Sequence, residues 1–176
     1  VCPVCGGPAR ISMENETKTL MCTNPKCQAK HIKAFALFVS RDAMNIEGLS
    51  EATLEKFIMN GFIKDFTDIF HLDRHEEEIK NMEGFGEKSY LNLQSSIQNA
   101  RTTTLPRLVY SLGIPNIGIS NARMICRALD NDPQRIMSAT EEELDEIQGV
   151  GEVIAGTFAE YFADGEHRDL FRRLLD

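Results

Sequence analysis

A short motif that recurs four times along the chain limits its fold more than any other feature. Each copy consists of an apolar residue, a variable residue, a turn-forming residue, a second apolar residue and a small residue that precedes an expected helix. The copies occupy residues 46–50, 82–86, 114–118 and 147–151. Their first residues are 36, 32 and 33 positions apart, and a period of this size indicates a repeated supersecondary unit. The sequence therefore predicts a tandem array of helical hairpins.

The second copy, residues 82–86, shows most clearly what the motif does. Gly84 permits a left-handed backbone turn that a side chain disfavours. Phe85 is placed to fill the space between two helices. Gly86 is placed to open the second helix, where unpaired N–H groups and the positive end of the helix dipole face outward. Such a surface binds anions, most simply phosphate. In the alternative interpretation the glycines only cap helices, although caps alone do not require glycine on both sides of Phe85.

The other copies depart from this pattern in different ways. In the first, Ser50 replaces the second glycine and is expected to cap the following helix, which begins with acidic residues that disfavour phosphate. In the third, Asn116 replaces the first glycine; asparagine tolerates a left-handed turn, so the geometry should survive with Gly118. The fourth is intact, with Gly149 and Gly151. The residue four positions later is expected to face inward in each copy: Leu54, Tyr90, Ala122 and Ala155.

The formal net charge of −8 argues against a general nucleic-acid binder, which is usually basic. The charges are unevenly distributed, however. Residues 1–43 carry six basic and three acidic side chains, whereas residues 44–176 carry 13 basic and 24 acidic ones. Within this acidic part, residues 101–129 contain no acid and four arginines: Arg101, Arg107, Arg123 and Arg127. Unless this gap in the acids is accidental, an acidic protein with one basic face can bind a polyanion locally.

Local charge also ranks the four hairpins as phosphate sites. The third lies in the acid-free stretch, with Arg107 before it and Arg123 and Arg127 after it. The second has one base, Lys88, beside acidic residues. The first and fourth are flanked by acids without a compensating Lys or Arg, so we expect mainly structural roles for them. The third hairpin is therefore expected to dominate phosphate binding, followed by the second.

Four cysteines near the N-terminus indicate a metal site. Cys2 and Cys5 are separated by two residues, and sixteen residues later comes a second pair, Cys22 and Cys27. This layout is typical of structural zinc sites, in which four thiolates leave no open position for catalysis. So short a segment cannot form a sufficient core, so metal binding would supply the folding free energy. Disulfides are the alternative, but nothing indicates secretion, and the odd fifth cysteine, Cys126, is expected to be a small buried apolar residue.

These residues carry a family resemblance. The repeated motif is similar to the helix-hairpin-helix motif, and four tandem copies resemble a domain near the C-terminus of bacterial NAD-dependent DNA ligases. The cysteine segment is similar to that family's Cys-Pro-x-Cys-Gly followed by Cys-Thr-Asn-Pro-x-Cys. The family usually continues with Pro-Ala-Gln, whereas Gln28 follows Cys27 here, a departure that leaves the ligands intact. The resemblance covers nearly the whole chain, and the start at Val1, directly before a candidate ligand, suggests a fragment of a longer protein.

The resemblance implies a function. It implies sequence-independent binding of nicked double-stranded DNA through phosphates, with a structural Zn²⁺, as part of an enzyme that seals nicks in DNA replication and repair. NAD would bind outside this fragment, because the resemblance places the adenylation and oligonucleotide-binding domains elsewhere, so no catalytic residue and no ligase activity are expected here. The implied partners are nicked DNA and the other ligase domains but no membrane, in a cytoplasmic, nucleoid-associated location. The alternatives are a hairpin module of another DNA repair protein and a helical protein–protein scaffold.

The expected fold is mainly α. Residues 1–30 would form a zinc-finger module with a short β-hairpin that turns near residues 14–16, residues 31–43 a linking helix, and residues 44–176 a compact domain of four tandem helix-hairpin-helix motifs. Thr102–Thr104 is expected to cap a helix. The candidate metal ligands are Cys2, Cys5, Cys22 and Cys27. The candidate DNA-contact residues are Gly84, Gly86, Lys88, Arg107, Asn116, Gly118, Arg123, Arg127, Gly149 and Gly151.

Overall fold

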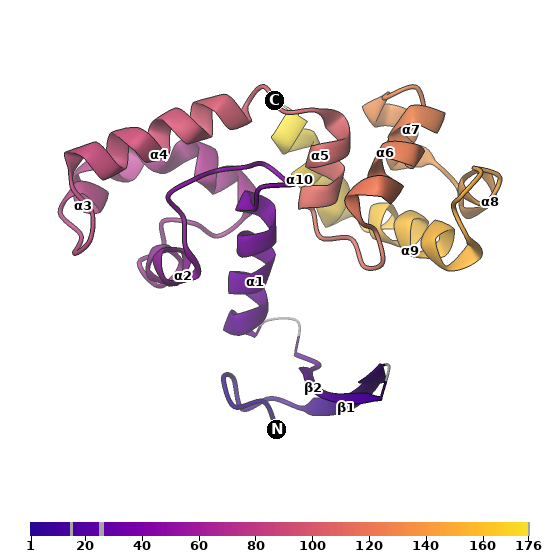
Figure 1. Cartoon of the computed structure of the whole chain (residues 1–176), viewed down its shortest axis with the longest axis horizontal. Helices are drawn as coiled ribbons and strands as arrows, with labels where there is room; N and C mark the ends of the chain where they lie inside the picture. The colour runs from indigo at the N-terminus through magenta and orange to yellow at the C-terminus, as the bar shows by residue number, and fades with distance from the viewer. Residues whose placement is uncertain (15, 25–26, 176) are drawn as a thin grey trace.

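A computed structural model describes residues 1–14, 16–24 and 27–175 of the chain. These residues are mainly helical, with one small β-hairpin at the N-terminal end (Figure 1). The strands are β1 (Ala9–Glu14) and β2 (Thr17–Cys22). The helices are α1 (Gln28–Val39), α2 (Glu51–Met59), the 3₁₀ helix η1 (Phe66–His75), α3 (Glu76–Lys80), α4 (Glu87–Ala100), α5 (Leu105–Ser111), α6 (Ile119–Ala128), α7 (Pro133–Ser138), α8 (Glu141–Asp145), α9 (Glu152–Ala163) and α10 (Gly165–Leu175). The mainly α fold with a small cysteine module is thus confirmed. No helix of the described residues is long and apolar enough to span a membrane.

The β-hairpin lies at one end of the molecule, beyond the N-terminal end of α1 (Figure 1). Its strands pair antiparallel, with Ala9 opposite Cys22 and Ile11 opposite Leu20. Ile11 and Leu20 are exposed, so the hairpin has little apolar core of its own. A two-stranded hairpin is marginally stable in isolation. The expected turn at residues 14–16 includes Asn15, which lies outside the described residues.

The helices share one apolar core. Phe35 and Phe38 of α1 pack on Phe66 of η1, with Phe38 and Phe66 stacked at a ring-centroid separation of 4.4 Å. In Figure 1, α2, α3 and α4 lie on one side of α1, and α5 to α9 lie on the other. The C-terminal helix α10 contacts both α9 and η1. It therefore ties the two halves together, and its Arg173 reinforces this by donating to Asp65 over 2.9 Å.

Two local features differ from the sequence-based expectations. Helix α7 was not anticipated, yet Asp132 caps it by accepting a hydrogen bond from the Gln134 N–H (3.0 Å), and Pro133 occupies its first turn. The expected threonine cap of α5 is present by position but not by side-chain hydrogen bonding. Thr104 stands at the N-cap position, but its side chain makes no capping hydrogen bond. The Thr102 hydroxyl instead donates to the carbonyl oxygen of Asn99 (2.8 Å).

Candidate metal centre and nucleic-acid interface

The four N-terminal cysteines converge on one point. Their sulfur atoms all lie within 4.8 Å of one another. The Sγ atoms of Cys2 and Cys27 are 3.9 Å apart, and those of Cys5 and Cys22 are 3.6 Å apart. These separations are too long for disulfides, in which the sulfurs are about 2.05 Å apart. They match the edge of a thiolate tetrahedron around zinc, which is roughly 3.8 Å for Zn–S bonds of about 2.3 Å. The cluster can therefore hold a metal ion.

Backbone and amide N–H groups around the cluster favour the thiolate form of its ligands. The Asn24 side-chain amide and the Gly7 N–H donate to the Cys5 sulfur over 3.5 and 3.4 Å, and they lower the pKa of Cys5 to about 6. The Asn24 N–H also donates to the Cys22 sulfur (3.4 Å), but burial raises the pKa of Cys22 to about 11. Four thiolates this close repel one another unless a cation lies between them. This donor set therefore suits a soft divalent metal.

The four hairpins adopt the same turn. The residue at the first-glycine position has a left-handed backbone in every copy, with φ of 95° at Gly48, 83° at Gly84, 65° at Asn116 and 90° at Gly149. In the last three copies, the next N–H donates back across the turn to the carbonyl of the first motif residue, over 3.0 to 3.1 Å. This combination is typical of a type II turn, which requires positive φ at its third residue. Asn116 therefore preserves the geometry, as expected.

Apolar side chains lock each turn between its two helices. The residue after each turn is buried at Leu49, Ile117 and Val150 and half-buried at Phe85. The expected inward-facing residues of the following helices are all buried as well: Leu54, Tyr90, Ala122 and Ala155. The hairpin loops are thus held rigidly by the core while their polar edges remain outside.

Three of the hairpins present an open helix N-terminus. Gly86, Gly118 and Gly151 are the N-cap residues of α4, α6 and α9, and none of them can supply a side-chain cap. Their φ values are negative, and a Cβ built on any of them would have no atom within 4 Å. Nothing within the described protein therefore requires glycine there. The absent side chain leaves the N–H groups open to close approach from outside.

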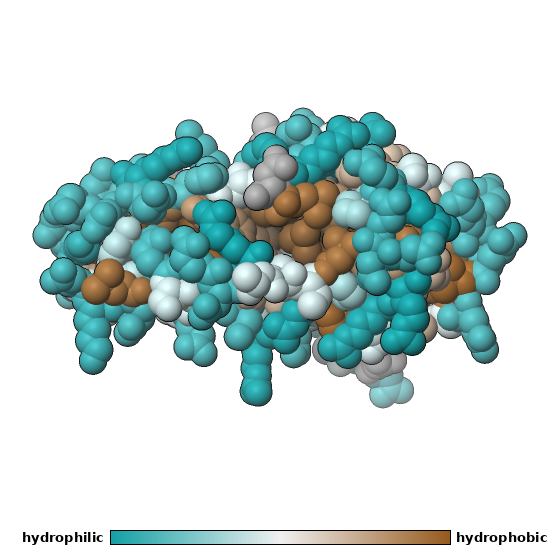
Figure 2. Space-filling model, turned by 90° about the horizontal axis from the view of Figure 1, so that it is seen from above, coloured by the Kyte–Doolittle hydropathy of each residue, from teal (hydrophilic) through white to brown (hydrophobic). Residues whose placement is uncertain are grey.

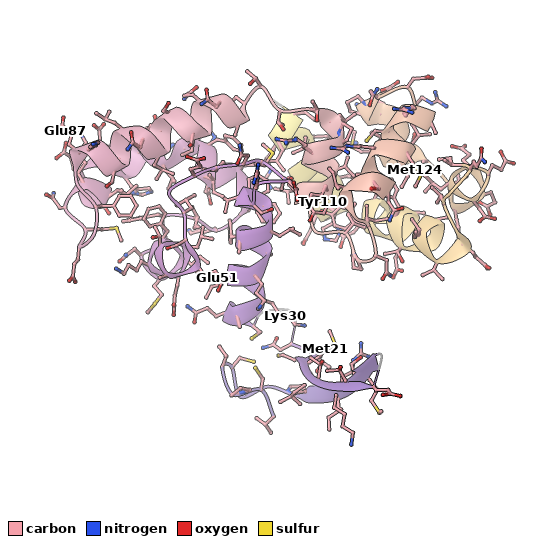
Figure 3. The ribbon with its side chains drawn as sticks, in the orientation of Figure 1. Met21, Lys30, Glu51, Glu87, Tyr110 and Met124 are labelled. Carbon is pink, nitrogen blue, oxygen red and sulfur yellow. The ribbon has the colours of Figure 1, made fainter. Side chains whose placement is uncertain are left out.

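The first hairpin differs because it satisfies its own helix N-terminus. The Ser50 hydroxyl accepts a hydrogen bond from the Thr53 N–H (3.2 Å) at the start of α2. Glu51 follows directly, in the first turn, where its charge complements the positive helix end (Figure 3). An incoming phosphate would meet an occupied donor, which sets this hairpin apart, whereas the first-turn carboxylate also occurs in the second and fourth hairpins as Glu87 and Glu152. The serine cap predicted from the sequence is thus present, and this hairpin is the least suited to bind an anion.

The structure brings two of the candidate basic residues together and separates the others. Arg123 and Arg127 of α6 line a surface pocket of about 410 Å³ together with Ile147 and Gln148, which begin the fourth hairpin. Arg107 lies on α5 in a different pocket, and Lys88 lies in the first turn of α4. Within the described residues, no ion pair or side-chain hydrogen bond engages any of these four basic side chains.

The expectation that the fourth hairpin has no basic neighbour is therefore wrong. Helix α6, which belongs to the third hairpin, packs against the fourth hairpin loop so closely that a Cβ on Gly149 would come within 2.9 Å of the Met124 sulfur (Figure 3). Arg123 flanks Met124 in the chain and so lies beside this loop. No signal in the local sequence of the fourth hairpin reveals this, because the arginines are about 20 residues away in the chain. The third and fourth hairpins share one basic surface.

The fold and these sites define a class of protein, one with tandem helix-hairpin-helix motifs and a four-cysteine module. A family model described as a helix-hairpin-helix motif matches residues 107–171, which contain the third and fourth hairpins.

Comparison with known proteins is more specific. The chain is 51% identical over 99% of its length to a DNA ligase of Lachnoclostridium phytofermentans, and 50% identical over 99% to one of Ruminiclostridium cellulolyticum. It is 35% identical to a DNA ligase of Petrotoga mobilis, again over 99% of its length. The chain spans about a quarter of these relatives, 27%, 27% and 26% of their lengths. The chain is thus similar to a segment of these DNA ligases, and its helix-hairpin-helix motif and four-cysteine cluster fit the C-terminal part of such a protein.

Proposed function

We propose that this chain is the part of an NAD-dependent DNA ligase that holds duplex DNA through its phosphates, without reading the base sequence. The observation that carries the proposal is the repeated open helix N-terminus at Gly86, Gly118 and Gly151, each fixed by the same turn. Similarity to DNA ligases supports the kind of anion, a nucleic-acid backbone.

The binding mechanism follows from the hairpin geometry. The N–H groups that follow each N-cap glycine point at the incoming phosphate, and the helix dipole adds partial positive charge. Because glycine has no side chain, the phosphate oxygens can approach the backbone closely. These groups contact only the backbone of the nucleic acid, so they position the duplex without specifying its sequence. Arg123 and Arg127, shared by the third and fourth hairpins, would add charge and release counterions from the DNA.

We further propose that Zn²⁺ is the metal and that its role is structural. Cys2, Cys5, Cys22 and Cys27 would supply all four ligands, which leaves no open coordination position for a substrate. The ion would join the β-hairpin to the start of α1, because Cys27 is the N-cap residue of that helix. Nick sealing with NAD as adenylate donor belongs, in this proposal, to the whole protein, with the cofactor bound outside residues 1–176. The whole ligase would act in the cytoplasm on nucleoid DNA.

A charge-removal pair tests the proposal. Arg123→Ala should weaken binding to nicked and intact duplexes of unrelated sequence by the same factor, because it removes a phosphate contact. The slope of log affinity against log salt should flatten by about 0.9. Lys18→Ala removes the same charge from β2, at the opposite end of the fold, and should leave affinity and slope nearly unchanged. Fluorescence anisotropy at several salt concentrations measures both quantities. Equal behaviour of the two variants would contradict the assignment of the hairpin surface.

A further inference from the structure

A second polar pocket lies outside the hairpin loops, where α4 gives way to α5. This junction pocket has a volume of about 270 Å³ and is lined by Met44, Asn45, Asn99, Ala100, Thr102, Thr103, Thr104 and Arg107. The connection between α4 and α5 runs along the upper edge of the molecule, close to the C-terminal end (Figure 1). Seen from above, this edge shows hydrophilic residues around an apolar area near its middle (Figure 2). The junction pocket is thus at the seam between the two halves of the helical domain.

The lining of the junction pocket is unusual for so acidic a protein. It contains no carboxylate, although the chain as a whole carries a net charge of −8. Its polar side chains are two asparagines, three threonines and one arginine. In complexes with DNA, arginine, threonine and asparagine side chains commonly donate to phosphate and sugar oxygens. The composition therefore suits a negatively charged sugar-phosphate backbone.

Most of these side chains have no partner within the protein. Among the described residues, no hydrogen bond or ion pair engages the side chains of Asn45, Asn99 or Arg107. Thr104 stands at the N-cap of α5, a position where threonine usually caps, yet its hydroxyl makes no capping bond. The pocket therefore presents donors that the fold itself does not use.

Thr103 provides the most informative contact. Its hydroxyl oxygen is buried and has no hydrogen-bond partner. A buried hydroxyl without a partner destabilises the folded state. Thr103 lines the junction pocket, and because no hydrogen bond among the described residues holds its hydroxyl, the hydroxyl can turn without losing such a bond. A phosphate oxygen in the pocket would then satisfy a donor that is unpaired in the free protein.

The neighbouring cavity is a weaker candidate. It has a volume of about 340 Å³, shares Met44, Ala100 and Thr103 with the junction pocket, and contains Arg101 and Arg173. Both arginines are already engaged, because Arg101 donates to the Phe70 carbonyl (3.0 Å) and Arg173 pairs with Asp65 and Asp169. By comparison, the one charged side chain of the junction pocket, Arg107, has no ion-pair or hydrogen-bond partner among the described residues.

We infer that the junction pocket binds a phosphodiester of duplex DNA, as a backbone contact additional to the hairpins. This inference rests on the proposed function. Asn45 directly precedes the first hairpin, and α5, which carries Arg107, is the first helix of the third hairpin. A contact here lies between the first and second hairpins on one side and the third and fourth hairpins on the other. It would fix how the DNA passes from one half of the domain to the other.

Neutral substitutions in the junction pocket test this inference. Thr103→Val keeps the branched shape but removes the hydroxyl, and it should weaken duplex binding roughly tenfold, the effect of one lost hydrogen bond to a charged group. Because no charge is removed, the salt slope should stay unchanged. The melting temperature should stay equal or rise, since an unpaired buried hydroxyl is replaced by a methyl group. Thr103→Ser keeps the hydroxyl and should bind like the unaltered protein. Asn99→Ala, at an exposed position, should also weaken binding at an unchanged slope.

Three outcomes are distinguishable in one anisotropy series on the full chain. If the unaltered protein fails to bind duplex DNA, the proposed function itself is overturned. If it binds and Arg123→Ala weakens it, but Thr103→Val and Asn99→Ala bind normally, the junction pocket makes no contact and only this inference is overturned. Loss of affinity in Thr103→Val together with unchanged stability and an unaffected Thr103→Ser supports the inference.

Discussion

At the scale of single residues, the two glycines of one hairpin have different physical roles. Gly149 has φ of +90°, a left-handed backbone that strains any other residue, so the protein's own structure favours glycine there, and a Cβ would in addition displace the flexible end of the Met124 side chain. Gly151 has φ of −86°, and a Cβ there would have open space around it. The pattern of glycines in the sequence does not distinguish these two roles. The backbone conformation of each glycine and the atoms around it distinguish them.

This contrast predicts that substituting Gly149 lowers stability, whereas substituting Gly151 lowers DNA affinity. Gly149→Ala should lower the free energy of unfolding by about 1–3 kcal/mol, because it forces a side chain into a strained backbone region against Met124. Gly151→Ala should change it by less than about 1 kcal/mol, because its backbone suits any residue and the N-cap preference for glycine over alanine is offset by the lower entropy of the unfolded alanine chain. It should nevertheless weaken DNA binding by covering the N–H groups. Urea unfolding and anisotropy measure the two effects, and a Gly151→Ala variant that binds normally would contradict the proposed approach of phosphate.

At the scale of secondary-structure elements, the sequence predicted what its local pattern encodes. The four turns, the serine cap at Ser50 and the buried positions after each turn follow from glycine conformation and helical periodicity, and all are present. The uncapped α5 and the arginines beside the fourth hairpin could not be predicted. They depend on which helices pack together, and this is set by contacts between residues far apart in the chain.

The attachment of α10 is one such contact, and it predicts an acid-sensitive element. Burial alone would raise the pKa of Asp65, but hydrogen bonds from Thr67 and Arg173 and the charge of Arg173 outweigh it, so the pKa lies below its usual value. A carboxyl with a depressed pKa contributes stability above its unfolded-state pKa and loses that contribution as the pH falls through the folded-state pKa.

We therefore expect Asp65→Asn to lower the free energy of unfolding at pH 7 by at most about 1 kcal/mol, because the ion pair with Arg173 is partly exposed. The difference between the variant and the unaltered protein should begin to shrink as the pH falls below about 4, where the unfolded carboxyl takes up its proton, and should vanish below the depressed folded-state pKa. Denaturation curves at pH 7 and at pH 3 measure it. A constant difference at both values would contradict a role for the Asp65 charge, because asparagine keeps the oxygen that accepts from the Thr67 N–H.

At the scale of the whole molecule, the two ends are stabilised by different forces. The helices bury their large apolar side chains in one continuous core. The cysteine module does not, because many of the exposed large apolar side chains of the described residues belong to it: Val1, Val4, Ile11, Met13, Leu20 and Met21. We therefore expect the folding of this segment to depend on a bound metal, as the brevity of the segment in the sequence also predicts.

Metal removal should therefore unfold one end of the molecule and spare the other. In the metal-loaded protein, bound thiolates and burial should keep the cysteines from reacting with a thiol reagent. A chelator should make the four module cysteines reactive: Cys2, Cys5, Cys22 and Cys27. Cys126 should remain protected, because it is fully buried in the helical core and burial raises its pKa to about 12. Mass spectrometry counts the modified thiols, and far-UV circular dichroism should retain most of its helical signal. Modification of Cys126 at the same rate as the other four would show that the helical core does not fold without the metal.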